Sequence, residues 1–193
     1  MKKVLLALSF GLALNVQASV IDVLPSNNNV GLSDDLTLNV NISGLNNNNA
    51  SLGVYDLTLN YDSSLFAVKS IQFGDSTKGN QLDLSGYGSL QTNDAGNGWI
   101  NLFELSFDAA DDLNVFQADD FRLFSVIFTA LDQGTSLFSI NANALGDAFG
   151  NNLALDGINN SQVNVTSVPE PTGIALMGLG VLALGLSRRK RTA

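Results

Sequence analysis

Short runs in which apolar and polar residues alternate constrain the fold of this chain more than any other feature. Residues 36–42 read Leu-Thr-Leu-Asn-Val-Asn-Ile, and residues 54–61 repeat the same alternation around two tyrosines. Successive side chains of a β-strand point to opposite faces, so a period of two predicts a strand with one buried and one solvated face. These two runs are therefore predicted to be strands that each cover part of a core.

The rest of the central region continues this pattern. Further strands are predicted over residues 99–107, 121–130, 136–142 and 162–165. Stretches rich in Asn and Gly, which accept left-handed backbone angles, separate them at residues 27–29, 46–49, 94–98 and 146–152. Residues 62–68 are predicted to hold at most one helical turn. Short strands at intervals of about 10 residues, without a long amphipathic helix, predict an all-β sandwich.

Two residues of the run 99–107 are candidates for function. Most acidic residues lie in polar turns, whereas Glu104 lies on a predicted strand, and we expect its side chain to face solvent. We expect Trp99 to pack in the core, because it lies within a strand pattern. The alternative for Trp99 is an exposed ring on which a sugar stacks.

Charge and composition exclude several classes of function. The segment 19–167 carries three cations (Lys69, Lys78 and Arg122) against seventeen acidic side chains, a formal charge of −14. Such a surface repels phosphate groups, so nucleic acid is excluded as a partner. The chain has no histidine and no cysteine, which excludes Ser-His-Asp and Cys-His catalysis and metal sites built from those residues. We therefore assign no catalytic residue, no metal ligand and no cofactor.

The many carboxylates leave two alternatives open. One is a carboxylate-based polysaccharide hydrolase, in which Glu104 would be the candidate acid. The other is a calcium-stabilised structural protein of the extracellular matrix. Oxygen-rich clusters lie at residues 94–98, 108–112 and 119–120, but none has the twelve-residue spacing of an EF-hand loop. We therefore interpret these clusters as solvated acidic loops.

The N-terminus has the three parts of a secretory signal. Two lysines follow Met1, residues 4–16 are mainly apolar, and small residues precede Ser19. This order predicts a signal peptide over residues 1–18 that signal peptidase cleaves between Ala18 and Ser19. The alternative is an uncleaved membrane anchor.

The C-terminus combines a proline motif, an apolar run and a basic cluster. The motif is Val168-Pro169-Glu170-Pro171, and the basic cluster is Arg188, Arg189, Lys190 and Arg191. Residues 172–186 carry no charge; as a helix they would rise ~22 Å against a hydrocarbon core of ~30 Å. We predict a short transmembrane helix, with the basic cluster acting as a stop-transfer signal on the cytoplasmic side. The alternative is a buried terminal helix.

This order of parts resembles the PEP-CTERM sorting signal of exported bacterial proteins. The resemblance implies that an exosortase, a membrane-embedded cysteine transpeptidase, recognises Pro169, Glu170 and Pro171 and processes the tail. It also implies a Gram-negative bacterium, with the protein in the inner membrane during processing and then at the cell surface or in the extracellular matrix of a biofilm. Residues 168–193 form this signal.

The central region resembles a second family. The run Tyr-Asp-Leu-Thr-Leu-Asn-Tyr-Asp at residues 55–62, followed by Leu65 and residues 68–71, is similar to the cohesin pattern. Residues 98–100 and 123–130 resemble that family's later strands. The resemblance spans residues 20–166 and implies a nine-stranded jelly-roll sandwich related to carbohydrate-binding modules. Cohesins of cellulosomes bind dockerin domains, but no dockerin-contact motif is evident in this chain.

Together these features predict three segments: a signal peptide (1–18), a cohesin-like β-sandwich (19–167) and a sorting signal (168–193). The leading hypothesis is an exported, non-enzymatic module that binds a protein or polysaccharide partner. The expected processing partners are signal peptidase and an exosortase-type enzyme, and the C-terminal helix would hold the chain in the membrane.

Overall fold

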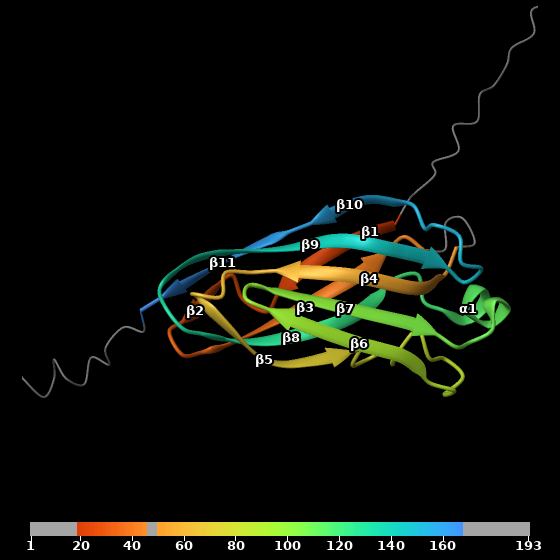
Figure 1. Cartoon of the computed structure of the whole chain (residues 1–193), viewed down its shortest axis with the longest axis horizontal. Coiled ribbons are helices and arrows are strands. Elements are labelled where there is room, and N and C mark those ends of the chain that lie inside the picture. The colour runs from red at the N-terminus through yellow and green to blue at the C-terminus, as the bar shows by residue number, and fades with distance from the viewer. Residues whose placement is uncertain (1–18, 46–49, 168–193) are drawn as a thin grey trace, which may run out of the picture.

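One sheet of the protein has five strands, in the order β10, β1, β3, β8 and β5 (Figure 1). The computed structural model describes residues 19–45 and 50–167. The strands of this sheet are Leu155–Asn159 (β10), Ser19–Pro25 (β1), Asp35–Ser43 (β3), Phe121–Ala130 (β8) and Phe66–Phe73 (β5). Neighbouring strands are antiparallel, except that β1 and β10 run parallel.

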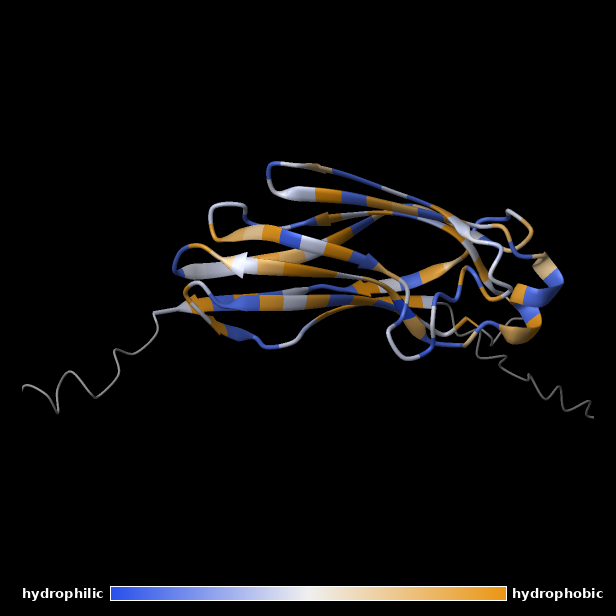
Figure 2. Cartoon of the chain, turned by 90° about the horizontal axis from the view of Figure 1, so that it is seen from below, coloured by the Kyte–Doolittle hydropathy of each residue, from blue (hydrophilic) through white to orange (hydrophobic). Residues whose placement is uncertain are grey.

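The second sheet has six strands, in the order β2, β11, β9, β4, β7 and β6. They are Asn29–Gly31 (β2), Ser161–Thr166 (β11), Gly134–Asp147 (β9), Leu52–Asn60 (β4), Trp99–Ser106 (β7) and Ser89–Gly96 (β6). The two sheets pack as layers of a sandwich, and hydropathy alternates along their strands (Figure 2). The predicted all-β sandwich is therefore confirmed.

Aromatic rings from both sheets form the centre of the core. The ring of Phe128 on β8 lies 4.9 Å from that of Tyr61 and 5.2 Å from that of Phe138 on β9, measured between centroids. Phe66 on β5 lies 5.1 Å from Phe138 and completes the cluster. Tilted and edge-to-face ring pairs at these separations add to the stabilisation from burial alone. The cluster thus packs the two sheets against each other and fixes the position of one sheet relative to the other.

All six predicted strands are present, but the described residues contain eleven strands where the resemblance implied nine. The predicted turn after β4 is also present, because the N–H groups of Leu65 and Phe66 both donate to the carbonyl of Asp62. The stretch 108–112 was expected as a loop, but it includes the start of helix α1, Ala110–Phe116. Leu113 is the one buried residue of α1, so the apolar pattern of this helix is too sparse to read.

The predicted signal peptide and the predicted membrane helix lie outside the described residues. Within residues 19–45 and 50–167, no helix is long and apolar enough to cross a membrane. The described chain ends next to β11, at the end of the sandwich opposite α1 (Figure 1). Any segment that follows residue 167 therefore starts from that end.

Asp75 fixes the loop after β5 to the beginning of β8. One carboxylate oxygen accepts from the N–H groups of Thr77 (2.7 Å) and Lys78 (3.0 Å), and the other accepts from the N–H of Arg122 (3.1 Å). Desolvation acts to raise the pKa of Asp75, but these three hydrogen bonds and the charge of Arg122 lower the pKa below its ordinary value of 3.8. The ionised form of Asp75 therefore stabilises the folded chain.

The fold should lose stability in acid. The pKa values of three further carboxyl groups are also lowered by their hydrogen bonds: Asp35, Asp62 and Asp147. Because the unfolded chain binds these protons more readily, the stabilisation is complete above the unfolded pKa near 3.8 and is lost as the pH falls through the lower folded values. We expect the melting temperature to be nearly constant down to about pH 5 and then to fall. Asp75→Asn should flatten this fall, whereas Asp94→Asn on exposed β6 should not; equal slopes in both variants would contradict the role of Asp75.

Candidate binding face

The outer surface of β9, β4, β7 and β6, called the binding face below, faces the viewer in Figure 1. No described helix or strand lies in front of it in that view. The alternation along β4 places Tyr55, Leu57 and Leu59 in the core and leaves the intervening side chains outside. The same alternation along β7 and β9 produces a continuous outward surface.

Four polar residues in the middle of the binding face form a hydrogen-bonded set, called the polar ladder: Asp56, Thr58, Asn101 and Asn143. One carboxylate oxygen of Asp56 accepts from the amide nitrogens of Asn101 (2.6 Å) and Asn143 (3.0 Å). Both amide nitrogens also donate to the hydroxyl of Thr58, at 3.2 Å and 3.0 Å. The ladder thus joins three strands and fixes the orientation of both amides.

The polar ladder presents acceptors to a partner. Its amide nitrogens are occupied by Asp56 and Thr58, whereas the amide oxygens of Asn101 and Asn143 accept no hydrogen bond from any described residue. A carboxylate held beside two amide oxygens attracts N–H groups, O–H groups and cations. The middle of the face is therefore suited to a partner that supplies hydrogen-bond donors.

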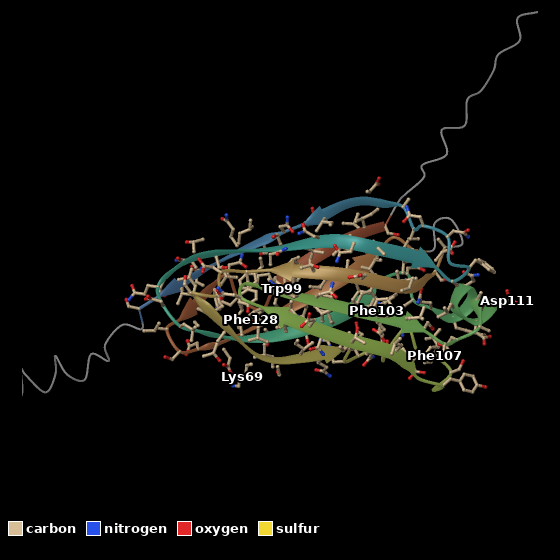
Figure 3. The ribbon with its side chains drawn as sticks, viewed as in Figure 1. Lys69, Trp99, Phe103, Phe107, Asp111 and Phe128 are labelled. Atoms are coloured by element: carbon tan, nitrogen blue, oxygen red, sulfur yellow. The ribbon has the colours of Figure 1, made fainter. Side chains whose placement is uncertain are left out.

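Large apolar side chains flank the ladder. Trp99 and Phe103 lie along β7 on the same side as Asn101 (Figure 3), and Leu137 on β9 is half exposed. Trp99 was expected in the core, and this expectation is wrong: its side chain is 36% exposed. The residues that share its side of the strand are Asn101 and Phe103, whereas Ile100 and Leu102 occupy the buried side.

Trp99 covers a glycine of the neighbouring strand. A Cβ at Gly96 would lie only 2.5 Å from Cε2 of the indole, so no other residue fits at position 96 without displacing the ring. The indole thereby shields the backbone of the edge strand β6 while part of its surface stays accessible. Such an amphipathic ring at the surface is a common anchor in protein interfaces.

Glu104 was expected to face solvent, and this expectation is also wrong. The side chain is 1% exposed, because it shares the inward side of β7 with Ile100 and Leu102. One carboxylate oxygen accepts from Asn80 (2.6 Å), Ser89 (2.6 Å) and Gln91 (2.8 Å). The other oxygen accepts from the hydroxyl of Tyr55 at 3.0 Å.

This network gives Glu104 a structural role. Burial, followed by the charge of Glu104, raises the pKa of Tyr55 well above its ordinary value, so the tyrosine remains a donor. The carboxylate lies inside the sandwich, where a polysaccharide chain cannot reach it. The hydrolase alternative therefore loses the acid on which it depended.

The acidic clusters also serve the fold. Asp108 accepts from the N–H groups of Leu84 (2.6 Å) and Ser85 (3.2 Å), and Asp120 forms an ion pair with Lys78 at 2.9 Å. Within the part of the chain that the structure describes, no group of three or more acidic side chains is placed to hold a metal ion. Asp108 and Asp120 therefore each fix a neighbouring loop.

Most site residues predicted from the sequence lie outside the described residues. These are Ala18, Val168, Pro169, Glu170, Pro171, Arg188, Arg189, Lys190 and Arg191. Ser19, on the other side of the predicted cleavage point, is described: it is buried, begins β1 and donates its N–H to the carbonyl of Ala154 at 3.3 Å. The ordered sandwich thus includes the residue that cleavage would leave at the N-terminus.

Comparison with known proteins identifies both parts of the chain. Residues 23–165 match the family model of the cohesin domain, and residues 167–191 match that of the PEP-CTERM protein-sorting motif. A comparison with curated protein sequences finds no match. The cohesin match covers most of the chain and agrees with the sandwich described above.

Solved cohesin structures share the fold at low sequence identity. A non-cellulosomal cohesin from Archaeoglobus fulgidus is 16% identical, with a TM-score of 0.57 over 78% of this chain and 92% of that one. A type II cohesin from the cellulosome of Acetivibrio cellulolyticus is 17% identical, with a TM-score of 0.62 over 76% and 95%. A cohesin module from a family 33 glycoside hydrolase of Clostridium perfringens is 13% identical, with a TM-score of 0.57 over 79% and 99%. The chain belongs to the cohesin domain family and carries a PEP-CTERM protein-sorting motif at its C-terminus.

Proposed function

We propose that the protein is exported, sorted through residues 168–193 by an exosortase-type enzyme, and binds a protein partner through the binding face. The observation that carries this proposal is the polar ladder, whose pre-oriented acceptors lie between exposed apolar anchors. Cohesins are non-catalytic protein-binding modules, which supports a binding role over an enzymatic one.

The chemistry of the face indicates what the partner offers. The ladder presents acceptors, and the segment 19–167 has a formal charge of −14, so a partner surface rich in donors and cations is favoured. Trp99 and Phe103 provide anchors that a partner can cover without ordering flexible side chains. A neutral or basic protein surface with an apolar depression fits both features.

The position of the tail supports display at a surface. Residue 167 lies at the end of the sandwich opposite α1, so the sorting signal would leave from one pole and not from the binding face. A chain held at the membrane through this signal would keep the face open to the exterior. The Gram-negative inner membrane, followed by the cell surface or the matrix, is the route we propose.

Site-specific photo-crosslinking tests the binding face. A photoreactive amino acid is placed at Thr58 in the full chain, produced in its native bacterium, and a control places it at Thr37 on the outer side of β3. We expect Thr58 to yield one discrete cross-linked protein and Thr37 to yield none. Asp56→Ala, which removes the acceptor shared by both amides, should reduce the yield at Thr58 at least ~10-fold, the equivalent of about 1.4 kcal/mol. The same product from both positions, or no product at Thr58, would contradict the proposal.

A polysaccharide partner is the second candidate, and the exposed ring of Trp99 is the observation that favours it. Electrophoresis in gels that contain the polysaccharides of the native bacterium tests this candidate. Retardation that is abolished by Trp99→Ala but retained in Leu137→Ala would support sugar binding. Unretarded migration in every gel would reject it.

A further inference from the structure

The end of the sandwich that carries α1 exposes an unusual number of large apolar side chains. Phe107, Val115, Phe116 and Phe149 are each between 57% and 69% exposed. Phe107 follows β7, the next two lie on α1, and Phe149 lies in the loop after β9. Apolar side chains that gather in this way on a soluble domain indicate an interaction site. We call this surface the α1 pole.

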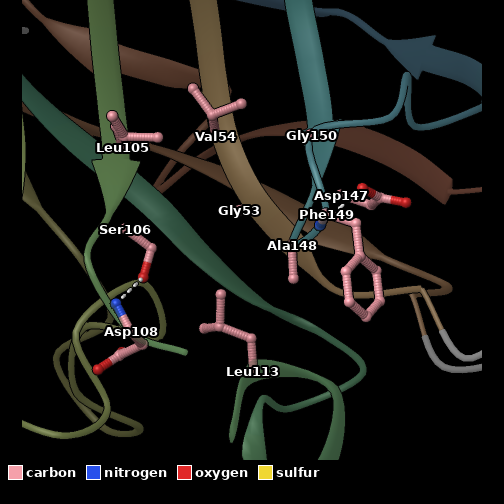
Figure 4. A pocket seen from close by; sticks show the side chains of 10 residues that line it. All are labelled: Gly53, Val54, Leu105, Ser106, Asp108, Leu113, Asp147, Ala148, Phe149 and Gly150. Carbon is pink, nitrogen blue, oxygen red and sulfur yellow. Dashed lines mark hydrogen bonds between the residues drawn. The ribbon is translucent and has the colours of Figure 1, made fainter. Parts of the chain in front are cut away.

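A cavity opens between the elements of the α1 pole. It has a volume of about 290 Å³ and lies between the ends of β4 and β7, helix α1 and the loop after β9 (Figure 4). Its apolar lining is Val54, Leu105, Leu113, Ala148 and Phe149. Leu113 reaches from α1 into this space and is also the residue that anchors the helix. The cavity is therefore a recess in which these apolar side chains lie beside the polar residues Ser106, Asp108 and Asp147.

Two acidic side chains line the recess, two more lie on helix α1, and no cation is among the lining residues. Asp108 and Asp147 belong to its lining, and Asp111 and Asp112 lie on the first turn of α1. Hydrogen bonds from Asn151 and the backbone of the same loop outweigh desolvation and hold the pKa of Asp147 below its ordinary value, so this group stays charged.

The cations of the described segments are engaged elsewhere. Lys69 pairs with Asp35 and Lys78 pairs with Asp120. Arg122 donates to the carbonyl of Gly74. The field at the α1 pole is consequently negative over a recess that is partly apolar.

We propose that the α1 pole docks a polypeptide segment of a partner protein in which one large apolar side chain is flanked by lysine or arginine. The apolar side chain enters the recess, and the flanking cations lie against Asp108, Asp111 and Asp112. A second copy of the chain does not fit, because it would bring an equally acidic pole against this one. An anionic lipid surface is repelled for the same reason.

This site adjoins the binding face, because Val54 and Leu105, on the outward sides of β4 and β7, belong to the lining of the recess. The recess lies at the first residues of β4 and the last residues of β7, whereas the polar ladder lies nearer the middle of those strands. The pole is also the end of the sandwich opposite residue 167 (Figure 1). A partner that docks there approaches from the side away from residue 167.

Selection from a random library of 12-residue peptides tests the proposal. The full chain in zwitterionic nanodiscs is the target, and the variant Phe149→Ser is used only afterwards, to measure the affinity of the selected peptides. Phe149 is 67% exposed, so this variant keeps the fold. Leu131→Ser, at a half-exposed residue outside the recess, is the matched control. We expect peptides with Phe, Leu or Trp flanked by Lys or Arg, which bind wild type and Leu131→Ser equally and Phe149→Ser at least ~10-fold more weakly.

A variant with fewer charges distinguishes the ionic contacts from the apolar contact in the recess. Asp111→Asn combined with Asp112→Asn should weaken the selected peptides and reduce the salt dependence of their binding. Recovery of acidic peptides, or equal binding to wild type and Phe149→Ser, would overturn the proposal. So would dimerisation in sedimentation experiments that Phe149→Ser abolishes, because the occupant would then be a second copy. Loss of cross-linking at Thr58 would leave this result unaffected, so the two proposals fail independently.

Discussion

Replacing Glu104 by leucine is expected to lower the free energy of unfolding by about 3–5 kcal/mol, the range for removing one partner from a buried charged network. The variant leaves the donors of Tyr55, Asn80, Ser89 and Gln91 without the acceptor that they share. Ser89 and Gln91 lie on the edge strand β6, and Asn80 lies in the loop that precedes it. The loss should therefore loosen β6 before the rest of the sandwich.

Graded variants separate charge from shape at this site. Glu104→Gln keeps the volume but presents a donor to other donors, so we expect it to cost about 2–3 kcal/mol. Tyr55→Phe removes one donor and should cost about 1–2 kcal/mol. Asp94→Asn on exposed β6 is the control and should change stability by less than about 0.5 kcal/mol. Urea unfolding measures all four, and a Glu104→Leu variant as stable as this control would show that the network does not hold β6.

Replacing both Pro169 and Pro171 by alanine is expected to stop processing of the tail. Each proline fixes its own φ angle and disfavours helix in the residue before it, so we expect the native motif to be extended. Alanine permits helical angles in the motif, and we expect the processing enzyme to lose the extended segment that it would recognise. We expect the processed fraction to fall at least ~10-fold and the precursor to accumulate in the membrane.

The chain provides its own control for this prediction. Pro25, at the end of β1, is its only other proline. Pro25→Ala should leave processing unchanged even if it alters stability slightly. Pulse labelling followed by gel mobility measures the two forms. Normal processing in the double variant would show that the proline motif is not what the enzyme recognises.

The sandwich could be predicted from the sequence because apolar and polar residues alternate along its half-buried strands. Residues 36–42 and 54–61 each have one apolar side, and both form strands that face the core. Strand β6 escaped prediction because it lies at a sheet edge, where Gln91, Asn93 and Asp94 are all exposed and no apolar side is required. Helix α1 was not predicted, because a helix with one buried leucine shows no repeat of apolar residues at helical spacing.

The errors at Trp99 and Glu104 have one origin. Residue type suggested that the tryptophan would be buried and the glutamate exposed, whereas the alternation of β7 placed them the other way round. Ile100 and Leu102 already indicated that the even-numbered residues of this strand face inward. Position along the strand therefore predicts the direction of residues 99 and 104 better than residue type does. The partners of Glu104 were not predictable, because Asn80 and Gln91 come from segments whose placement depends on the whole fold.

The polar ladder could be predicted in part. Asp56 and Thr58 alternate with the buried residues of β4, and Asn101 does the same on β7, so their outward direction follows from the sequence. Asn143 joins them only because β9 has a bulge opposite Asp56 and Leu57, which turns an additional residue toward the face. A register irregularity of this kind has no local signal in a single sequence.

Intact-mass spectrometry of the protein recovered from the membranes and the medium of its native bacterium tests most directly whether this cohesin domain is exported and trimmed at both ends. We predict a mature polypeptide that begins at Ser19 and ends before Arg188, outside the cytoplasm. A full-length polypeptide in the cytosol, with Met1 and Ala193 both retained, would contradict the account.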